Sequence, residues 1–460
     1  MPTIFRAASL FFSPIMPTPF HFTEPARTLS LLDTADVLVL GAGPGGIGAA
    51  ISAARNGVKV ILAERFGCFG GTWTNGILSA IMPFPYVRGI FAEITARLQR
   101  EAAWRSWNNH YGAGGQYDTE TAKLVLDRMV KEAGIRPYFF TQAAAVIRDG
   151  SRLAGVIVES KEGRQVITAR QFIDATGDGD VSVLAGADYA IGRDEDGASQ
   201  PMSLIFKIGG IDDDALHAYR KTDRTCEQAW RRAKAAGEVT VPREDLLLFA
   251  LPRPGTWAIN GTRIVNKDAT RVSDVTDAMI EGRRQAAEIV AFLRRHIPGC
   301  RDAVLIETAP HIGVRESRRI RCDYTITAED ILEVPEFEDC IARGNWFIDI
   351  HSPTGEGTRR LYPPDGKSYG IPWRSLRVRG LDNLLVASRC LDCTHEAHAA
   401  IRITAQIVAV GQAAGTAAAL CVRHGHKSTR DLDPALLRSV LREQGAFLSA
   451  SEPAALAAVG

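Results

Sequence analysis

The chain has 460 residues, of which 46% are hydrophobic and 23% are charged, as in folded soluble proteins. This composition excludes a disordered chain, a collagen and a coiled-coil rod, and the length predicts two or three domains. The net charge is +1, from 54 basic and 53 acidic residues, which argues against nucleic acid or an anionic membrane as a partner. Eight cysteines, mostly far apart, favour reduced thiols and a cytoplasmic location over a disulfide framework.

The first 34 residues are expected to be an N-terminal extension. Phe and Pro residues interrupt the apolar part, and a single basic residue, Arg6, precedes it, so the segment makes a poor signal peptide. The alternative is that the natural chain starts at Met16.

Alternating strand and helix patterns follow this extension. Residues 36–40 (DVLVL) predict a buried parallel strand, residues 46–57 a helix of small residues that ends at Asn56-Gly57, and residues 58–64 a second strand. Together they form one βαβ unit of about the usual 30 residues.

Further along the chain, residues 119–133 predict a helix, because apolar side chains recur at helical spacing after an N-cap at Asp118 or Thr119. Three strands joined by short turns are then predicted at residues 143–149, 152–160 and 164–175. Three consecutive strands of this kind indicate a β-meander.

Residues 200–374 have a different character, with Pro-containing turns, a charged helix near residues 274–296 and little βαβ periodicity. They predict a separate substrate or cap domain. The chain then returns to a strand at residues 383–389 and to a helix of small residues at 403–422. That helix is uncharged over the length of a bilayer span, but its glutamines, glycines and alanines favour burial within the protein, so no membrane span is predicted.

The segment Gly41-Ala42-Gly43-Pro44-Gly45-Gly46 fits the G-x-G-x-x-G dinucleotide fingerprint, and it lies between a predicted strand and a predicted helix, as that fingerprint requires. Gly41 permits the tight turn, Gly43 leaves room for a pyrophosphate, and Gly46 lets the helix pack closely on the strand. The helix N-terminus faces the phosphates with its partial positive charge. Glu64 ends the next strand, where a ribose-binding carboxylate belongs.

Three later segments resemble the FAD-binding elements of flavoproteins. They are a second glycine-rich loop after Glu64, the turn DATGDGDVS at residues 174–182, and the strand and helix of residues 381–419, whose N-terminal side meets the isoalloxazine in such proteins. Their order resembles the glutathione-reductase-like FAD fold. In detail the chain resembles the FAD-dependent oxidoreductase family, which also shows stretches like residues 313–332 and 347–358.

The resemblance implies bound FAD and redox chemistry but no particular substrate. Cofactor-binding residues are carried over where the motifs match: Gly41, Gly43, Gly46, Glu64, Arg65, Gly71, Thr72, Thr176, Gly177, Asp178, Arg389, Gly411 and Gln412. Val146 is added because it lies on a strand that offers backbone atoms to adenine in such proteins.

These patterns predict an α/β protein with a discontinuous, Rossmann-like FAD-binding domain of glutathione-reductase type (residues 35–190 and 375–440). A second, α+β substrate or cap domain (191–374) and a C-terminal tail (441–460) complete the chain. Only one G-x-G-x-x-G is present, and residues 190–374 offer no second βαβ unit for NAD(P)H. Where disulfide reductases carry a redox cysteine pair, this chain reads Thr72-Trp73-Thr74-Asn75, which argues against that chemistry.

The richest cluster of candidate catalytic groups is CLDCTHEAH at residues 390–398, just before the flavin-facing helix. His395 or Glu396 could take a substrate proton while a hydride leaves for the flavin, or they could only satisfy loop backbone groups. For Cys390 and Cys393 three roles are open: zinc ligands together with nearby histidines, a redox dithiol, or inert core thiols. The close spacing argues against zinc, and no metal site is predicted.

Three more side chains are candidates. Arg402 could stabilise a reduced, anionic flavin, hold a substrate carboxylate or form a structural salt bridge. Arg315 belongs to a dense charge run (315–321) that is typical of a solvated strand or helix. His351 ends a predicted strand, and a residue at a strand end is placed to serve a site.

The resulting hypothesis is an FAD-dependent oxidoreductase that transfers a hydride between a small organic substrate and non-covalently bound FAD, preferably as a dehydrogenase or oxidase. A flavin monooxygenase and a non-catalytic FAD-fold binding module are the alternatives. The substrate, the electron acceptor and the oligomeric state, including a homo-oligomer, stay open.

Overall fold

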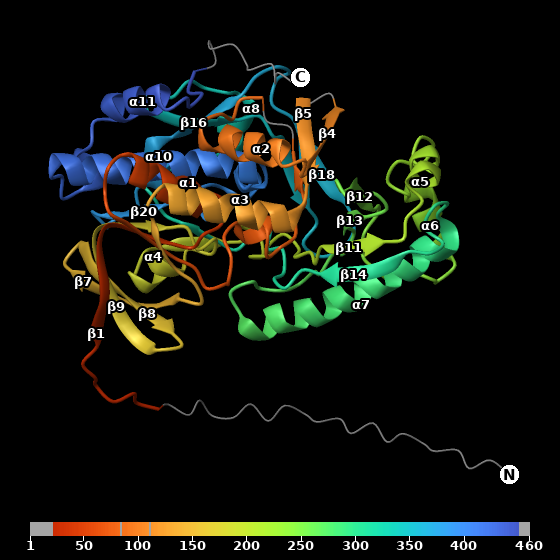
Figure 1. Cartoon of the computed structure of the whole chain (residues 1–460), viewed down its shortest axis with the longest axis horizontal. Helices are drawn as coiled ribbons and strands as arrows, with labels where there is room; N and C mark the ends of the chain where they lie inside the picture. The colour runs from red at the N-terminus through yellow and green to blue at the C-terminus, as the bar shows by residue number, and fades with distance from the viewer. Residues whose placement is uncertain (1–21, 83–84, 110–111, 450–460) are drawn as a thin grey trace.

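A computed structural model describes residues 22–82, 85–109 and 112–449 of the chain. The first 21 residues of the expected extension and the last 11 residues of the expected tail, 450–460, lie outside the described residues. The central layer is a parallel sheet (Figure 1) with the strand order β6 (Arg136–Tyr138), β2 (Val60–Ala63), β1 (Ser30–Leu40), β9 (Gly163–Asp174) and β20 (Leu384–Val386). β1 begins earlier than the predicted residues 36–40, because the long β9 also pairs with its first half.

The predicted β-meander continues from this parallel layer. The first half of β9 pairs antiparallel with β8 (Arg152–Ser160), which pairs with β7 (Gln142–Asp149), so the three predicted strands are confirmed. The last residues of β9 pair instead with β20. The carboxyl ends of β1, β2, β9 and β20 therefore meet at one edge of the sheet, the edge at which parallel α/β proteins bind ligands.

Two helices of small residues, α1 (Pro44–Arg55) and α10 (Thr404–His424), pack against each other over one face of this sheet (Figure 1). Glycines bring their backbones into contact: a Cβ on Gly411 would lie 2.0 Å from the carbonyl oxygen of Gly45, and one on Gly415 would lie 2.0 Å from that of Ala49. α10 is long and apolar enough to span a bilayer, yet 94% of its most apolar window is buried. The predicted burial of this helix is thus confirmed.

The same face carries α2 (Ile90–Arg100) and α3 (Thr119–Glu132) (Figure 1). The side chain of Asp118 accepts a hydrogen bond from the backbone N–H of Thr121 at 2.8 Å and so caps α3, as predicted. After α10, the helix α11 (Pro434–Glu443) extends past the start of the expected tail at residue 441.

A second, antiparallel sheet lies to one side of the first (Figure 1), with the order β12 (Leu247–Ala250), β13 (Trp257–Asn260), β11 (Phe206–Gly209) and β14 (Val304–Thr308). Helices α5 (Asp213–Tyr219), α6 (Glu227–Ala235) and α7 (Val272–His296) pack on it, and α7 confirms the predicted charged helix. The sheet and these helices share a core built around Trp230, Trp257 and Phe292.

One end of this second sheet faces the first. Phe206, the first residue of β11, pairs with Ile259 near the end of β13 and with Thr308 at the end of β14. The segments that lead into β11 and out of β13 and β14 therefore emerge together. This common end supplies much of one wall of the cavity described below.

The remaining elements are short: η1 (Gly71–Trp73), β3 (Ala80–Ile81), β4 (Trp104–Asn109), β5 (Gly112–Tyr117), α4 (Asp180–Leu184), β10 (Tyr189–Ile191), β15 (Arg318–Ile320), α8 (Ala328–Leu332), β16 (Cys340–Gly344), β17 (Ile348–His351), β18 (Thr358–Leu361), β19 (Tyr369–Pro372), η2 (Trp373–Leu376), α9 (His395–Ile401) and η3 (Thr429–Asp431). Several of them, from β15 to η2, bury side chains such as Ile341, Tyr369 and Trp373 in the core around the parallel sheet. The division of the chain into domains stays a prediction.

The contact between α1 and α10 predicts an unusual effect of adding a methyl group. Alanine has the higher helix propensity, by about 1 kcal/mol, so Gly411→Ala would stabilise an isolated helix. Here the new Cβ would overlap the carbonyl oxygen of Gly45, so we expect Gly411→Ala to lower the free energy of unfolding by about 1–3 kcal/mol. Denaturant unfolding followed by circular dichroism measures this change.

Ala409→Gly is the matched control, since Ala409 is half-buried on the same helix and the exchange changes propensity in the opposite direction. It should cost about 1 kcal/mol from propensity alone. A Gly411→Ala variant as stable as the parent would contradict the packing described here.

Candidate functional site

The glycine-rich turn between β1 and α1 has the geometry that its sequence predicts. Gly41 has a φ of +93°, and a Cβ there would lie 2.4 Å from the carbonyl oxygen of Ala175. A Cβ on Gly46 would lie 1.8 Å from the carbonyl oxygen of Gly41, so α1 starts in backbone contact with the turn. At Gly43, by contrast, no described atom beyond the residue itself and its two chain neighbours lies within 4 Å of the Cβ position. The turn thus leaves open space beside the N-terminus of α1, where a phosphate group fits.

The second glycine-rich loop folds onto this turn. The N–H of Gly70 donates a hydrogen bond to the carbonyl oxygen of Ala42 at 2.7 Å, and a Cβ on Gly71 would come within 2.8 Å of the Cα of Gly43. Thr72 follows and lines the same open space. The two loops therefore form one continuous backbone wall.

Glu64 lies directly after β2, beside the glycine turn. Its carboxylate accepts hydrogen bonds from the backbone N–H groups of Ala42 at 2.6 Å and Phe66 at 3.0 Å. Burial raises the pKa of Glu64, and these hydrogen bonds oppose that shift. Glu64 therefore holds the turn in place while it also faces the cavity.

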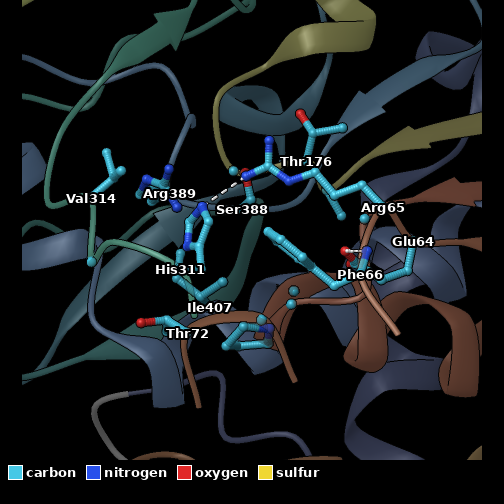
Figure 2. Close-up of a pocket in the computed structure, with 18 of the residues that line it drawn as sticks. Glu64, Arg65, Phe66, Thr72, Thr176, His311, Val314, Ser388, Arg389 and Ile407 are labelled. Carbon is cyan, nitrogen blue, oxygen red and sulfur yellow. Dashed lines mark hydrogen bonds between the residues drawn. The ribbon is translucent and has the colours of Figure 1, made fainter. Parts of the chain in front are cut away.

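A cavity of about 1520 Å³, its mouth to solvent included, joins these loops to distant parts of the chain (Figure 2). It lies between the carboxyl edge of the parallel sheet and the common end of the antiparallel sheet. Predicted site residues that line it are Gly41, Gly43, Glu64, Arg65, Gly71, Thr72, Thr176, Gly177, Arg315, Arg389 and Arg402. Predicted site residues outside its lining are Gly46, Val146, Asp178, His351, His395, Glu396, Gly411 and Gln412.

Asp178 supports the lining from behind. Its carboxylate accepts hydrogen bonds from Nη2 of Arg389 at 2.6 Å and from the hydroxyl of Ser317 at 2.7 Å. Burial opposes ionisation, but Arg389 and Ser317 hold the pKa of Asp178 below its usual range. Gly177 leaves room for this pair, because a Cβ there would lie 2.7 Å from Nη1 of Arg389.

Three of the residues assigned to the cofactor have packing contacts instead. Gly411 lies against Gly45, and Oε1 of Gln412 accepts a hydrogen bond from the backbone N–H of Ile90 at 3.1 Å. Val146 pairs with Val156 inside the meander, whereas β7 reaches the cavity at its first residues, 142 and 143. Contact of these three residues with a cofactor stays a prediction.

The buried ring of His395 is oriented by a carboxylate. Nδ1 of His395 lies 2.9 Å from Oε1 of Glu316, and the other oxygen of Glu316 accepts from the N–H of Gln200 at 2.9 Å. Glu316 also pairs with Arg319. Although burial opposes it, the hydrogen bond with His395 and the charge of Arg319 lower the pKa of Glu316. Glu396, the neighbour of His395, is half-buried.

His398 and the two cysteines make separate contacts. Nε2 of His398 donates to the carbonyl oxygen of Arg389 at 2.9 Å, which leaves Nδ1 buried without a partner in the described structure. Burial lowers the pKa of His398 to about 3. Cys390 and Cys393 are free, and burial raises the pKa of each thiol. Because the thiolate is the reactive form, these shifts favour inert core thiols.

The charge run 315–321 was expected to be exposed to solvent, but several of its side chains are buried. Arg315, Glu316 and Arg319 are buried, with exposures of 9%, 1% and 2%, so a solvated strand or helix is wrong for them. They are buried because each finds polar partners. Nη1 of Arg315 donates to the carbonyl oxygen of Pro201 at 2.8 Å and to the hydroxyl of Ser203 at 2.6 Å.

Arg402 and His351 meet around Asp349. Arg402 lies between α9 and α10, lines the cavity and donates to the backbone carbonyl of Asp349 at 3.4 Å. His351 ends β17, as predicted, but lies behind the lining, with Nε2 3.4 Å from the carboxylate of Asp349 and Nδ1 3.2 Å from Nη2 of Arg263. Burial and nearby Arg315 lower the pKa of His351 to about 3.

Sequence reasoning missed several polar side chains in the lining, and three of them come from segments at the common end of the second sheet: Ser203, Asn260 and His311. His311 stands between Arg65 and Arg389 in Figure 2, with Nε2 3.0 Å from Nη2 of Arg65. None of the three belongs to a sequence motif, so they could be recognised as site residues only once the topology of the second sheet was known.

A family model described as FAD dependent oxidoreductase matches residues 36–441. The chain belongs to the FAD-dependent oxidoreductase family. Its fold is a mixed α/β structure with a Rossmann-like parallel sheet, and the cofactor of the family is FAD.

Similarity to individual relatives is partial. The chain is 28% identical over 150 residues to a soluble pyridine nucleotide transhydrogenase of Chromohalobacter salexigens, which covers 31% of this chain and 30% of that protein. It is 31% identical over 156 residues to a thiamine thiazole synthase of Methanococcus maripaludis, which covers 31% of this chain and 55% of that protein. The matches thus span about a third and about half of these curated relatives.

A solved structure resembles nearly the whole chain at low identity. It is a geranylgeranyl bacteriochlorophyll reductase-like protein of Thermoplasma acidophilum, with a TM-score of 0.48 and 13% identity over 91% of this chain and 93% of that chain.

The cavity fits FAD in three respects. Gly43 leaves space for a pyrophosphate, the N-terminus of α1 points a partial positive charge at it, and Glu64 stands at the strand end where a ribose would accept or donate hydrogen bonds. These residues would hold the nucleotide part of FAD in this oxidoreductase.

Gly43→Ala should separate cofactor binding from folding. The backbone of Gly43 is extended (φ −68°, ψ −173°) and nothing crowds its Cβ position, so we expect unchanged unfolding of the FAD-free protein. The added methyl group would occupy the phosphate space and raise the dissociation constant of FAD by about tenfold or more, roughly 1.4 kcal/mol. Fluorescence quenching of added FAD measures this constant.

Gly355→Ala is the matched control, because Gly355 also has an uncrowded Cβ position without a positive φ, and it lies outside the cavity lining. It should leave FAD affinity unchanged. Unaltered affinity in Gly43→Ala would refute the assignment of the phosphate space.

His398 predicts a pH dependence of stability. Its pKa falls from an ordinary 6.5 to about 3 in the folded state, so the unfolded state binds a proton that the folded state does not. The part of the unfolding free energy that comes from a neutral His398 is fully present above pH 6.5. It is lost as the pH falls toward 3, by at most about 1.4 kcal/mol per pH unit. We expect His398→Gln to flatten the fall of the unfolding free energy between pH 6.5 and 4.

Denaturant unfolding at several pH values measures the slope. His424→Gln, at the exposed end of α10, is the control. Its unfolding free energy should change with pH as steeply as that of the parent. Identical slopes for the parent and His398→Gln would show that His398 is not held neutral.

Proposed function

We propose that this oxidoreductase is a dehydrogenase or oxidase that moves a hydride between a small organic substrate and non-covalently bound FAD. The observation that carries the proposal is the continuity of the cavity. One space runs from the open Gly43 position to a polar wall that includes Asn260, Arg315 and Arg402. A cofactor held at the glycine end would therefore share its cavity with a small molecule at the arginine end.

We also propose the glutathione-reductase type for the FAD-binding fold. Its support is the β-meander that feeds into β9, and the return of the chain to the same sheet at β20 after the second sheet. Parallel pairing between the described strands occurs in the central sheet alone. This agrees with a single dinucleotide site per chain.

FAD, when bound, would supply the hydride chemistry, and the chain would bind, orient and exclude water. Apolar side chains of Ile205, Ile312 and Ile407 also line the cavity. If Nδ1 of His395 donates to Glu316, its Nε2 is left as a proton acceptor, as in other histidine–carboxylate pairs. We therefore propose His395, placed just behind the lining, as the group that takes the substrate proton.

Spectroscopy of the purified protein tests the proposal. We expect a visible flavin absorption band, release of free FAD on acid precipitation, and anaerobic bleaching of the band by members of a panel of small alcohols, amines and hydroxy acids. A protein that retains no flavin band after incubation with FAD and removal of the unbound FAD by gel filtration would exclude the proposed function.

Two other outcomes favour the alternatives. Reduction by NAD(P)H followed by oxygen-dependent hydroxylation of a substrate would indicate a monooxygenase. Bound FAD that neither substrates nor chemical reductants can reduce would indicate a binding module without catalysis.

A further inference from the structure

Two arginines in the cavity wall, the buried Arg315 and the half-buried Arg402, form no ion pair in the described structure. Arg315 donates to the carbonyl oxygen of Pro201 and the hydroxyl of Ser203, and Arg402 donates to the backbone carbonyl of Asp349. In the part of the chain that the structure describes, neither side chain forms an ion pair. Both line the cavity, from segments nearly ninety residues apart in sequence.

The acids nearest to these arginines are already engaged. The carboxylate of Asp349 lies 3.4 Å from Nε2 of His351 and 3.4 Å from Nε of Arg360, and Glu316 pairs with Arg319 and lies 2.9 Å from Nδ1 of His395. Among the described residues, no acidic side chain therefore forms an ion pair with Arg315 or Arg402, although the charges of Asp349 and Glu316 act on Arg402 from a distance.

Burying two positive charges near each other without a counterion is costly. Burial, and then the charges of Arg402, Arg243 and Arg263, push the pKa of Arg315 well below its usual range. Guanidinium groups nonetheless stay protonated in proteins, so the unfavourable charge has to be balanced by something that enters the cavity. Unsatisfied groups point the same way: Nε of Arg402 and Oδ1 of Asn260 are buried without partners in the described structure.

We propose that the substrate of this enzyme carries a carboxylate group, which Arg315 and Arg402 bind together in the cavity wall. The proposal rests on the proposed function and names its substrate class. Two planar guanidinium forks match the planar, bidentate geometry of a carboxylate, whereas a lysine would offer only a point charge. The carboxylate would fix the substrate in one orientation, with its remaining part beside the apolar side chains of the lining.

Binding of matched acid and amide probes tests the inference without relying on turnover. The FAD-loaded protein is titrated with benzoate and benzamide, and with butyrate and butyramide, by calorimetry and by perturbation of the flavin spectrum. We expect at least one carboxylate to bind about tenfold or more tightly than its amide, because the uncharged amide cannot form an ion pair with either arginine.

Variants assign the effect to the proposed residues. Arg402→Gln should raise the dissociation constant of the carboxylate by about tenfold or more, and Arg402→Lys and Arg315→Lys by smaller factors, since they keep the charge but lose the fork. Arg360→Gln is the matched control: it removes the same charge from the other side of Asp349 and lies outside the cavity lining, so it should leave the affinity unchanged.

Three results would overturn the inference: amides that bind as well as their acids, a carboxylate affinity that Arg402→Gln leaves unaltered, and inorganic phosphate that binds more tightly than either carboxylate. A shift of the flavin reduction potential in Arg402→Gln without a loss of carboxylate affinity would also overturn it, and would assign Arg402 to the cofactor.

The experiments distinguish a failure of the carboxylate inference from a failure of the proposed function. If FAD binds and a neutral alcohol bleaches it while neither carboxylate binds, the proposed function stands and this inference falls. The calorimetric titration needs no flavin, so carboxylate binding is read even in a preparation that takes up no FAD.

Discussion

The backbone contact between α1 and α10 is the constraint on which the rest of the structure depends. Gly411 and Gly415 meet the carbonyl oxygens of Gly45 and Ala49, and side chains larger than hydrogen would force the two helices apart. Because α1 begins at the glycine turn and α10 begins just after Arg402, this contact also sets the distance between the two ends of the cavity. A packing interaction between two helices thus positions both the phosphate space and a charged wall.

The cavity combines two kinds of sheet edge. The carboxyl ends of the parallel strands present backbone groups and short turns, which suit a cofactor that many proteins share. The common end of the antiparallel sheet presents side chains such as Ser203, Asn260 and His311, which belong to no cofactor motif. Family membership therefore informs cofactor binding at the parallel-sheet edge far more than it informs the choice of substrate.

The sequence predicted local elements well because their patterns are local. The βαβ unit, the meander, α3 with its cap at Asp118, and the buried α10 follow from periodicity and from turn and cap residues within a few positions. Gly43 could be assigned for the same reason, since its role depends on the turn that contains it. Gly411 shows the limit: its small size is needed by α1, a helix more than 350 positions earlier, rather than visibly by a ligand.

The charge run at 315–321 could not be interpreted from sequence because burial of a charge depends on partners elsewhere in the chain. Arg315 is buried against Pro201 and Ser203, and Glu316 against His395, and neither contact leaves a mark in the local pattern. A net charge of +1 over the chain conceals this local imbalance. Distributed charges are solvated at little cost, whereas two unpaired guanidinium groups at a cavity are retained against a penalty of several kcal/mol. Such a penalty persists where the folded protein gains function from it, and here the gain would be a site that is complete only when an anion fills it.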